Sequence, residues 1–338
     1  MSWSVVGFAL GLAVIGAVAA IVAAGLVAVG LPVAIALTKP GSARRADLAL
    51  LGGLLPAVTA VVGMALVAGP SLLALVSLAV DHCLQHDHHG HLCPTHLQGL
   101  APWLAVVGGA VIAAVAGRMG LRLGARARQR RLVLASSLLG EHQRLDDGTT
   151  LVVLDGPPSL LHAADHFVVA SKSLLAGLTA PSRRAALAHE AAHVRRGDSR
   201  WLHRLALAAA LSPPLFGTWI QRLYRQAAEE AADEAAAVIV GAIDIAAAVV
   251  EVSRLRLRLQ HPALVNLPAI DGGDLTLRIQ RLLELEPRTR PSGAPVVMAL
   301  LLLATLAVAP FFDRVHHLAE TALAHVEHPH HQHDPHSH

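Results

Sequence analysis

His189-Glu190-Ala191-Ala192-His193 is the stretch of sequence that decides how this chain is organised. Its form, H-E-x-x-H, is typical of a helix that holds a zinc ion and carries a general base. Histidines four residues apart lie on one face of a helix, so their neutral imidazoles can share one metal ion. Glu190 is placed to take a proton from a metal-bound water. We therefore expect a catalytic zinc site with His189 and His193 as ligands and Glu190 as the base.

Two less specific explanations also account for this pattern. A chain with 22 histidines can contain H-E-x-x-H by chance, and two histidines on one helical face can be a packed core pair. The context favours the metal site, because Thr179-Ala180-Pro181-Ser182 has the form of a helix start with proline in the first turn. Residues 185–187 then continue as helix formers.

The acidic stretch from residue 225 to residue 235 supplies a third ligand, about one small helical hairpin downstream. Glu229 and Asp233 are four residues apart, so they too lie on one face of a helix. Glu229 can complete a site of two histidines and one glutamate, whose fourth position stays open for water and substrate. Asp233 and Asp198 are candidates to accept hydrogen bonds from the remaining ring nitrogens of the histidines.

Spacing alone does not separate Glu229 from its neighbour Glu230. Acidic residues on alanine-rich helices usually form a solvated face, and we expect Glu230 or Glu234 to lie on such a face. Tyr224, the only tyrosine, is a candidate to stabilise the oxyanion of a hydrolytic reaction, although a tyrosine in this setting is more often simply packed.

The composition indicates a membrane protein that crosses the bilayer several times. Hydrophobic residues make up 54% of the 338 residues and charged residues only 15%, and the mean hydropathy is +0.52. A soluble domain is more polar than this. The apolar runs that we expect to span the membrane cover about residues 4–37, 48–80, 100–117 and 294–312. The third of these, residues 100–117, is short for a membrane crossing, so a buried core helix is the alternative for it.

Basic residues near the spans predict the orientation, because lysine and arginine concentrate in cytoplasmic loops. The first connector holds Lys39, Arg44 and Arg45, and six arginines lie within residues 118–131, whereas residues 81–99 contain neither type. We expect the arginine cluster to set topology and contact anionic lipid, with no direct nucleic-acid binding, because no aromatic residues interleave with it. We expect a multi-pass protein of the cell inner (plasma) membrane. Its predicted parts are three spans in residues 1–117 with an external loop at 81–99, a cytoplasmic metallopeptidase domain at 118–292, a fourth span at 293–312 and an external tail at 313–338.

The cytoplasmic segment has the length of one compact domain. Residues 151–155 and 166–170 are short β-rich runs that predict a small sheet, whose edge could align an extended peptide beside the zinc. Residues 201–220 are apolar but interrupted by Ser212-Pro213-Pro214, which indicates an interfacial or re-entrant hairpin rather than a full span. An arginine-containing amphipathic helix is expected near residues 275–285.

Both segments predicted to be external are rich in histidine. They hold 15 of the 22 histidines, a composition that suits Zn²⁺, Cu²⁺ or Ni²⁺ and suggests a metal-buffering or metal-sensing role, with a linker of no specific role as the alternative. Cys83 and Cys93, the only cysteines, can close a disulfide loop in an oxidising compartment or bind metal. The candidate external ligands are His82, His86, His88, His89, His91, His96, His328, His330, His331 and His333.

Several stretches together resemble the membrane zinc metallopeptidases that act as β-lactam sensor-transducers. They are Val168–Leu178, Ala186–Asp198, Leu211–Trp219 and Arg225–Ala235, the last with Ala232 where the family commonly has cysteine. The resemblance implies three spans, a cytoplasmic zinc domain, a fourth span and an external sensor, and it favours Glu229 as the third ligand. A short histidine-rich tail stands where the family's antibiotic sensors carry a penicillin-binding domain, which argues against a β-lactam stimulus.

The fold class expected from these features is a mainly α, polytopic membrane protein of about four transmembrane helices with a cytoplasmic α+β zincin-like metallopeptidase domain. The resemblance implies a zinc endopeptidase that cleaves a cytoplasmic transcriptional repressor, or itself, in response to an external stimulus. One alternative is a housekeeping membrane zinc protease of the prenyl-protein or heat-shock type, which two full spans between His193 and Glu229 would favour. The other is a non-enzymatic metal-binding or metal-transport protein, which ionisable residues inside the spans would favour.

Overall fold

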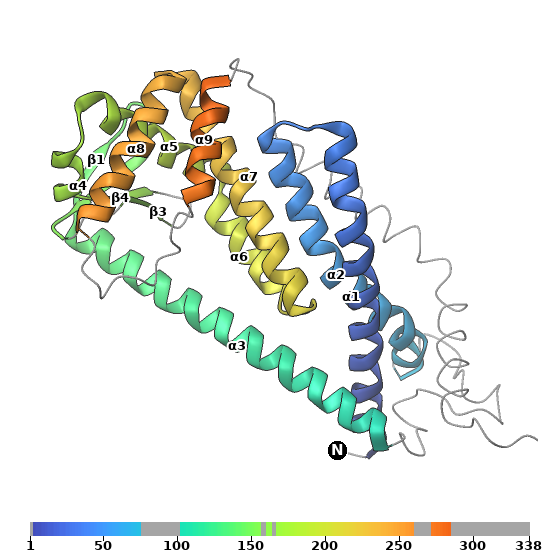
Figure 1. Cartoon of the computed structure of the whole chain (residues 1–338). Coiled ribbons are helices and arrows are strands. Elements are labelled where there is room, and N and C mark those ends of the chain that lie inside the picture. Colours follow the sequence, from blue (N-terminus) through green and yellow to red (C-terminus); the bar gives the residue numbers. More distant parts are fainter. Residues whose placement is uncertain (1–2, 76–101, 157–159, 164–166, 260–271, 285–338) are drawn as a thin grey trace, which may run out of the picture.

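Three long apolar helices dominate the computed structural model, which describes residues 3–75, 102–156, 160–163, 167–259 and 272–284 (Figure 1). By length and composition, three helices among these residues can cross a membrane: Val5–Thr38, Ser42–Gly69 and Pro102–Leu139. The protein is thus a mostly helical, membrane-associated protein. The expected fourth span, the histidine-rich loop with Cys83 and Cys93, and the histidine-rich tail lie outside the described residues.

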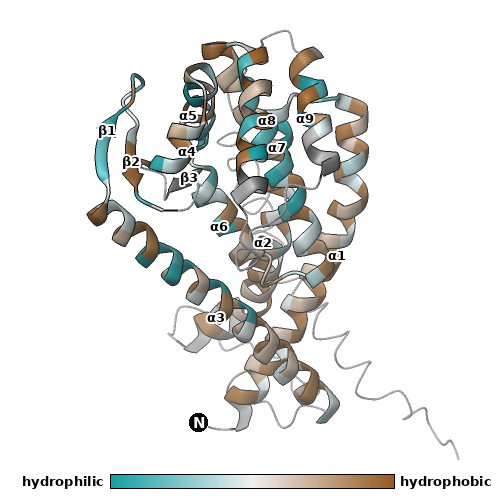
Figure 2. Cartoon of the chain, turned by 60° about the vertical axis from the view of Figure 1, so that its left-hand side comes forward, coloured by the Kyte–Doolittle hydropathy of each residue, from teal (hydrophilic) through white to brown (hydrophobic). Residues whose placement is uncertain are grey.

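The membrane helices are α1 (Trp3–Thr38), α2 (Ser42–Leu75) and α3 (Pro102–Leu139). α1 and α2 pack as a hairpin, while α3 runs from the N-terminal part of α1 to the sheet (Figure 1). α3 does not end with its apolar run at Gly117 but continues as one helix through the arginines, because arginine is a good helix former and no proline interrupts it. Hydrophobic residues dominate α1 and the first half of α3, and polar residues become frequent in its second half (Figure 2).

A four-stranded sheet follows α3, in the order β1-β2-β4-β3. β2 and β4 pair in parallel, and β1 and β3 pair antiparallel at the two edges. The two strands expected from sequence are confirmed to within a residue or so, whereas the edge strands were not expected; β1 is fully exposed and polar and therefore has no apolar pattern. The bounds are β1 Glu141–Arg144, β2 Thr150–Leu154, β3 Leu160–Ala163 and β4 Phe167–Ser171.

Six helices complete the described part of the domain. One face of the sheet, with Leu151, Val153 and Val168, packs on the core that also holds Ala185 and Ile245; on the other face Val152 and Val169 pack near the end of α3. The alternation follows from the two-residue period of a strand. The helices are α4 Lys172–Gly177, α5 Ala180–Arg196, α6 Asp198–Ala208, α7 Pro214–Val240, α8 Ala242–Leu259 and α9 Gly272–Glu284.

α6 and α7 form the interrupted hairpin that the sequence predicted over residues 201–220. The hairpin packs on the membrane helices, because Leu205 of α6 and Ile220 of α7 share one core with Val27 and Leu50 of α1 and α2. Arg118 of α3 donates hydrogen bonds to the carbonyls of Ala209 and Ser212, which fixes the turn between α6 and α7. The hairpin therefore connects the membrane helices to the part of the chain that carries the candidate site.

Candidate metal centre

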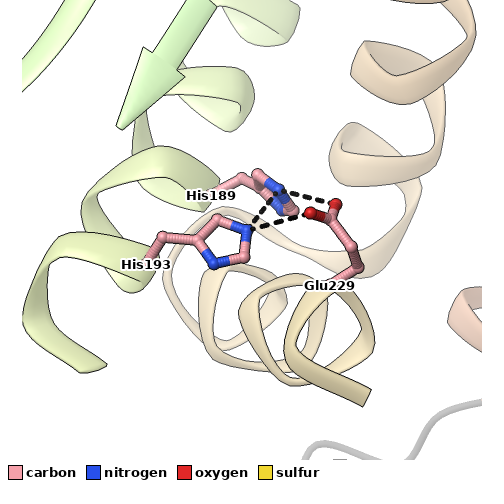
Figure 3. Close-up of side chains that lie close together, drawn as sticks. All are labelled: His189, His193 and Glu229. Atoms are coloured by element: carbon pink, nitrogen blue, oxygen red, sulfur yellow. Dashed lines mark hydrogen bonds and ion pairs between the residues drawn. The ribbon is translucent and has the colours of Figure 1, made fainter. Parts of the chain in front are cut away.

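His189 and His193 of α5 face Glu229 of α7 across a short gap (Figure 3). The two Nε2 atoms lie 3.2 Å apart, His189 Nε2 lies 3.5 Å from Glu229 Oε2, and His193 Nε2 lies 3.5 Å from Glu229 Oε1. A tetrahedral zinc ion with bonds of about 2.0–2.1 Å requires its ligand atoms to be roughly 3.3 Å apart. The two histidines therefore approach different oxygens of one carboxylate, and one ligand atom from each of the three residues can be chosen so that all lie within 4.8 Å of one another. Two imidazole nitrogens and one carboxylate in this arrangement form a donor set for one metal ion with a fourth position open.

Local sequence positions the histidines. Thr179 caps the start of α5, where its hydroxyl accepts a hydrogen bond from the backbone N–H of Ser182. α5 ends at Gly197, which adopts a left-handed φ of 66° and turns the chain directly into α6. This turn brings Asp198, the first residue of α6, back over the last turns of α5.

His193 is oriented by Asp198. Its Nδ1 lies 2.7 Å from Asp198 Oδ2, and the tautomer that donates this hydrogen bond presents the lone pair of Nε2 to the gap. Asp198 is buried and also accepts a hydrogen bond from the hydroxyl of Tyr224 at 3.0 Å. Burial raises the pKa of this carboxyl, but the contacts with His193, Arg196 and Tyr224 outweigh burial and lower it, so Asp198 stays ionised.

Asp233, one turn beyond Glu229 on α7, lies against His189. Nδ1 of His189 lies 2.8 Å from Asp233 Oδ1, although the angle departs from that of a hydrogen bond. Asp233 in turn accepts two hydrogen bonds from Arg278 of α9, from Nε at 2.8 Å and from Nη2 at 2.9 Å. The structure therefore places both carboxylates that the sequence suggested, each against the Nδ1 atom of a different histidine.

The charges of the site favour a bound cation. Burial lowers the pKa of His189, yet the carboxylates of Asp233 and Glu229 outweigh burial and raise it to about 10 in the metal-free protein. Burial also raises the pKa values of Glu229 and Asp233, and there the contact with His189 and the charge of Arg278 outweigh it and lower both. In the metal-free protein the positive charge of protonated His189 therefore balances the carboxylates, as the charge of a bound metal ion would.

Glu190 lies on α5 between the two histidines, and its side chain is buried. Tyr224 follows the packed alternative: its hydroxyl donates a hydrogen bond to Asp198, and its side chain is buried in the core between α7 and the membrane helices. It therefore supports the carboxylate that orients His193.

Glu230 requires a correction. It does not lie on a solvated face, because it is only 5% exposed and forms ion pairs with Arg45 at the start of α2 and Arg281 of α9. Sequence reasoning also missed Arg278, which contacts two carboxylates of the site. Buried carboxylates require a cationic partner, which indicates that some arginine or lysine lies near Asp233 and Glu229. No spacing rule identifies that partner as residue 278.

Comparisons with protein-family models, with curated proteins and with solved structures find no match to this chain.

Proposed function

We propose that the protein is a membrane-bound zinc metalloendopeptidase that transduces a signal by cleaving a cytoplasmic protein, in the first place a transcriptional repressor, or by cleaving itself. The observation that carries the proposal is the triangle of His189, His193 and Glu229, whose ligand atoms lie within 4.8 Å of one another, together with the buried Glu190 directly after His189 on α5. Two nitrogens and one carboxylate with an open fourth position are the donor set of catalytic rather than structural zinc.

In this proposal each residue has a defined task. His189, His193 and Glu229 would hold the ion, which supplies a Lewis acid that activates water and polarises a peptide carbonyl. Glu190 would take the proton of the attacking water and pass it to the leaving amine. Asp198 and Asp233 keep the Nδ1 atoms of the histidines engaged, so that both Nε2 atoms stay directed at the same point.

The sheet offers a means of holding a substrate. β3 is an edge strand of the described sheet and contacts α5, the helix that carries the histidines. An extended peptide could pair with its free edge and so run beside the metal centre. This supports an endopeptidase that binds extended segments of protein rather than a hydrolase of small molecules.

The α6–α7 hairpin favours a signal transducer over a housekeeping membrane protease. α6 has 11 residues, so at about 1.5 Å per residue it is roughly half as long as a membrane crossing requires. It cannot supply one of the two full spans expected between His193 and Glu229 in the housekeeping enzymes. In our proposal the arginines of α3 keep the domain in the cytoplasm, a fourth span follows α9, and the histidine-rich external segments receive the stimulus, in which a transition metal is the first candidate.

The test uses the full-length protein in detergent, with zinc content and cleavage of both the chain itself and an unfolded protein substrate as readouts. Glu190→Gln should retain zinc and lose about 10²–10⁴-fold in cleavage rate, because only the proton transfer is removed. His189→Ala should lose both zinc and cleavage. Glu234→Gln makes the same carboxylate-to-amide change on α7 and should alter neither. Undiminished cleavage by Glu190→Gln would end the proposal.

A further inference from the structure

Arg278 of α9 connects two carboxylates of the metal centre through one buried side chain. It is only 9% exposed. Its Nε and Nη2 atoms bond both oxygens of Asp233, at 2.8 and 2.9 Å, and its Nη1 atom lies 3.1 Å from Glu229 Oε2. A guanidinium is planar and has its donors in fixed positions, so these contacts fix the two carboxylates relative to each other.

The oxygen that Arg278 contacts is the one that faces His189. Glu229 Oε2 lies 3.5 Å from His189 Nε2. Glu229 is also the least buried donor of the triangle, with 38% of its side chain exposed, whereas the side chains of His189 and His193 are 13% and 3% exposed. A glutamate side chain has three rotatable bonds, and packing around an exposed one restricts it little. The contact with Arg278 therefore provides a restraint that packing does not.

We propose that Arg278 is a positioning residue for the metal centre: it holds Glu229 in the orientation that completes the triangle and holds Asp233 against His189. This inference rests on the proposed zinc site but assigns a residue on a third helix to it. The centre is then assembled from α5, α7 and α9, and docking of α9 is part of its construction.

A nearby cation has an opposing effect, because it repels a metal ion. The two effects can be separated through Glu229. Repulsion by Arg278 acts whether or not Glu229 is present, whereas positioning of Glu229 acts only when Glu229 is present. A double-mutant cycle of these two residues therefore isolates the positioning of Glu229 both from repulsion and from the contact with Asp233.

The same helix offers a matched control. Arg281, three residues beyond Arg278, forms an ion pair with Glu230, the neighbour of Glu229 on α7. Arg281→Ala removes an arginine of α9 that also bonds to α7, but one that touches neither Asp233 nor Glu229 in any contact described above. This variant therefore measures how much Zn²⁺ affinity is lost when α9 packs less firmly on α7.

The experiment measures Zn²⁺ affinity of the full-length protein in detergent by competition with a chelator, and the visible spectrum of the Co²⁺-loaded protein. Arg278→Ala should weaken Zn²⁺ binding by about 10–100-fold, the usual effect of losing a partner behind a metal ligand. In a Glu229→Ala background the same substitution should cause a clearly smaller loss, because only the effect of Arg278 through Asp233 remains. The Co²⁺ spectrum of Arg278→Ala should shift toward that of Glu229→Ala, while Arg281→Ala should keep the wild-type spectrum and stay within about twofold in affinity.

Arg278→Lys keeps the positive charge but lacks the fixed N–H donors of the guanidinium, and it replaces the alanine variant if that variant does not fold. Its Zn²⁺ affinity should also be reduced, because one ammonium group cannot bond both carboxylates with the same geometry. An unchanged affinity in Arg278→Ala, an equal loss in both backgrounds, full rescue by lysine, or an equal effect of Arg281→Ala would each overturn the assignment. A wild-type protein that binds Zn²⁺ but cleaves nothing would refute the proposed function and leave this inference standing; a wild-type protein that binds no Zn²⁺ would overturn both.

Discussion

Gly53 of α2 lies where the membrane helices meet the α6–α7 hairpin. A Cβ atom added there would overlap Leu205 Cδ1 and lie 3.1 Å from Ile220 Cγ1. Leu205 and Ile220 are both fully buried, so neither side chain has free space to enter. We therefore predict that Gly53→Ala forces α2 and the hairpin apart, or forces Leu205 out of its rotamer.

The magnitude follows from two opposing effects. Overpacking a closely packed core costs about 1–3 kcal/mol. Replacing glycine by alanine inside a helix contributes about 1 kcal/mol of stability in return. Gly63 of the same helix provides the reference, because a Cβ atom there would meet only Ala19 Cβ, at an ordinary 3.6 Å. Gly63→Ala should stabilise by about 1 kcal/mol, so the difference of about 1–3 kcal/mol between the two variants isolates the steric cost.

The assay is reversible unfolding of the metal-free protein in mixed micelles, followed by circular dichroism, with Zn²⁺ affinity as a second readout. Gly53→Ala should also weaken Zn²⁺ binding, because the hairpin it displaces carries Asp198 at the start of α6 and Glu229 on α7. Equal stabilities for Gly53→Ala and Gly63→Ala would refute the close packing of the hairpin on α2.

Two further predictions concern protons and hydrogen bonds at the centre. The pKa of His189 is raised from 6.5 to about 10 by Asp233 and Glu229 despite burial, so its stabilising charge is fully present below about pH 6.5 and is lost as the pH rises toward 10. The metal-free protein should therefore lose thermal stability over that range, and Zn²⁺ binding at pH 7 should release about one proton, measured by calorimetry in buffers of different ionisation enthalpy; absence of proton release would contradict the assignment. Tyr224→Phe should destabilise the protein by about 1–3 kcal/mol in thermal unfolding, because it leaves buried Asp198 without one of its donors, and an unchanged melting temperature would show that the hydroxyl contributes nothing.

The parts that sequence predicted well are those with local causes. The strands around Leu151 and Val168 are β-branched runs between turn residues, and α5 has a threonine cap at one end and a glycine at the other. The H-E-x-x-H spacing placed His189 and His193 on one face for the same reason. Each of these features depends on residues within one or two helical turns of each other.

The contacts that sequence did not predict join distant parts of the chain. Arg45 and Arg281 are 185 and 51 positions from Glu230, and both approach it only because α2 and α9 pack on α7. A single sequence contains no periodicity that connects such residues. The length of α3 was underestimated for another reason: hydropathy detects where a helix stops being apolar, not where it stops being a helix.

The ambiguity between Glu229 and Glu230 had a physical solution within α7 itself. Phe216, Ile220, Tyr224 and Ala227 recur at helical spacing and form the face that packs on α1 and α2, and Glu230 follows Ala227 by three residues on the same side. A second stripe on α7 begins at its C-terminal end, where Val240 and Ala236 pack in the core with α5 and α8. Asp233 and Glu229 extend this stripe toward the N-terminus, each about one helical turn further. Adjacent residues on a helix point about 100° apart, so one glutamate must face the histidines and the other the membrane helices. Extending each apolar stripe into the acidic stretch thus separates the faces of Glu229 and Glu230 from sequence alone, whereas which face meets the histidines follows only from the packing of α7.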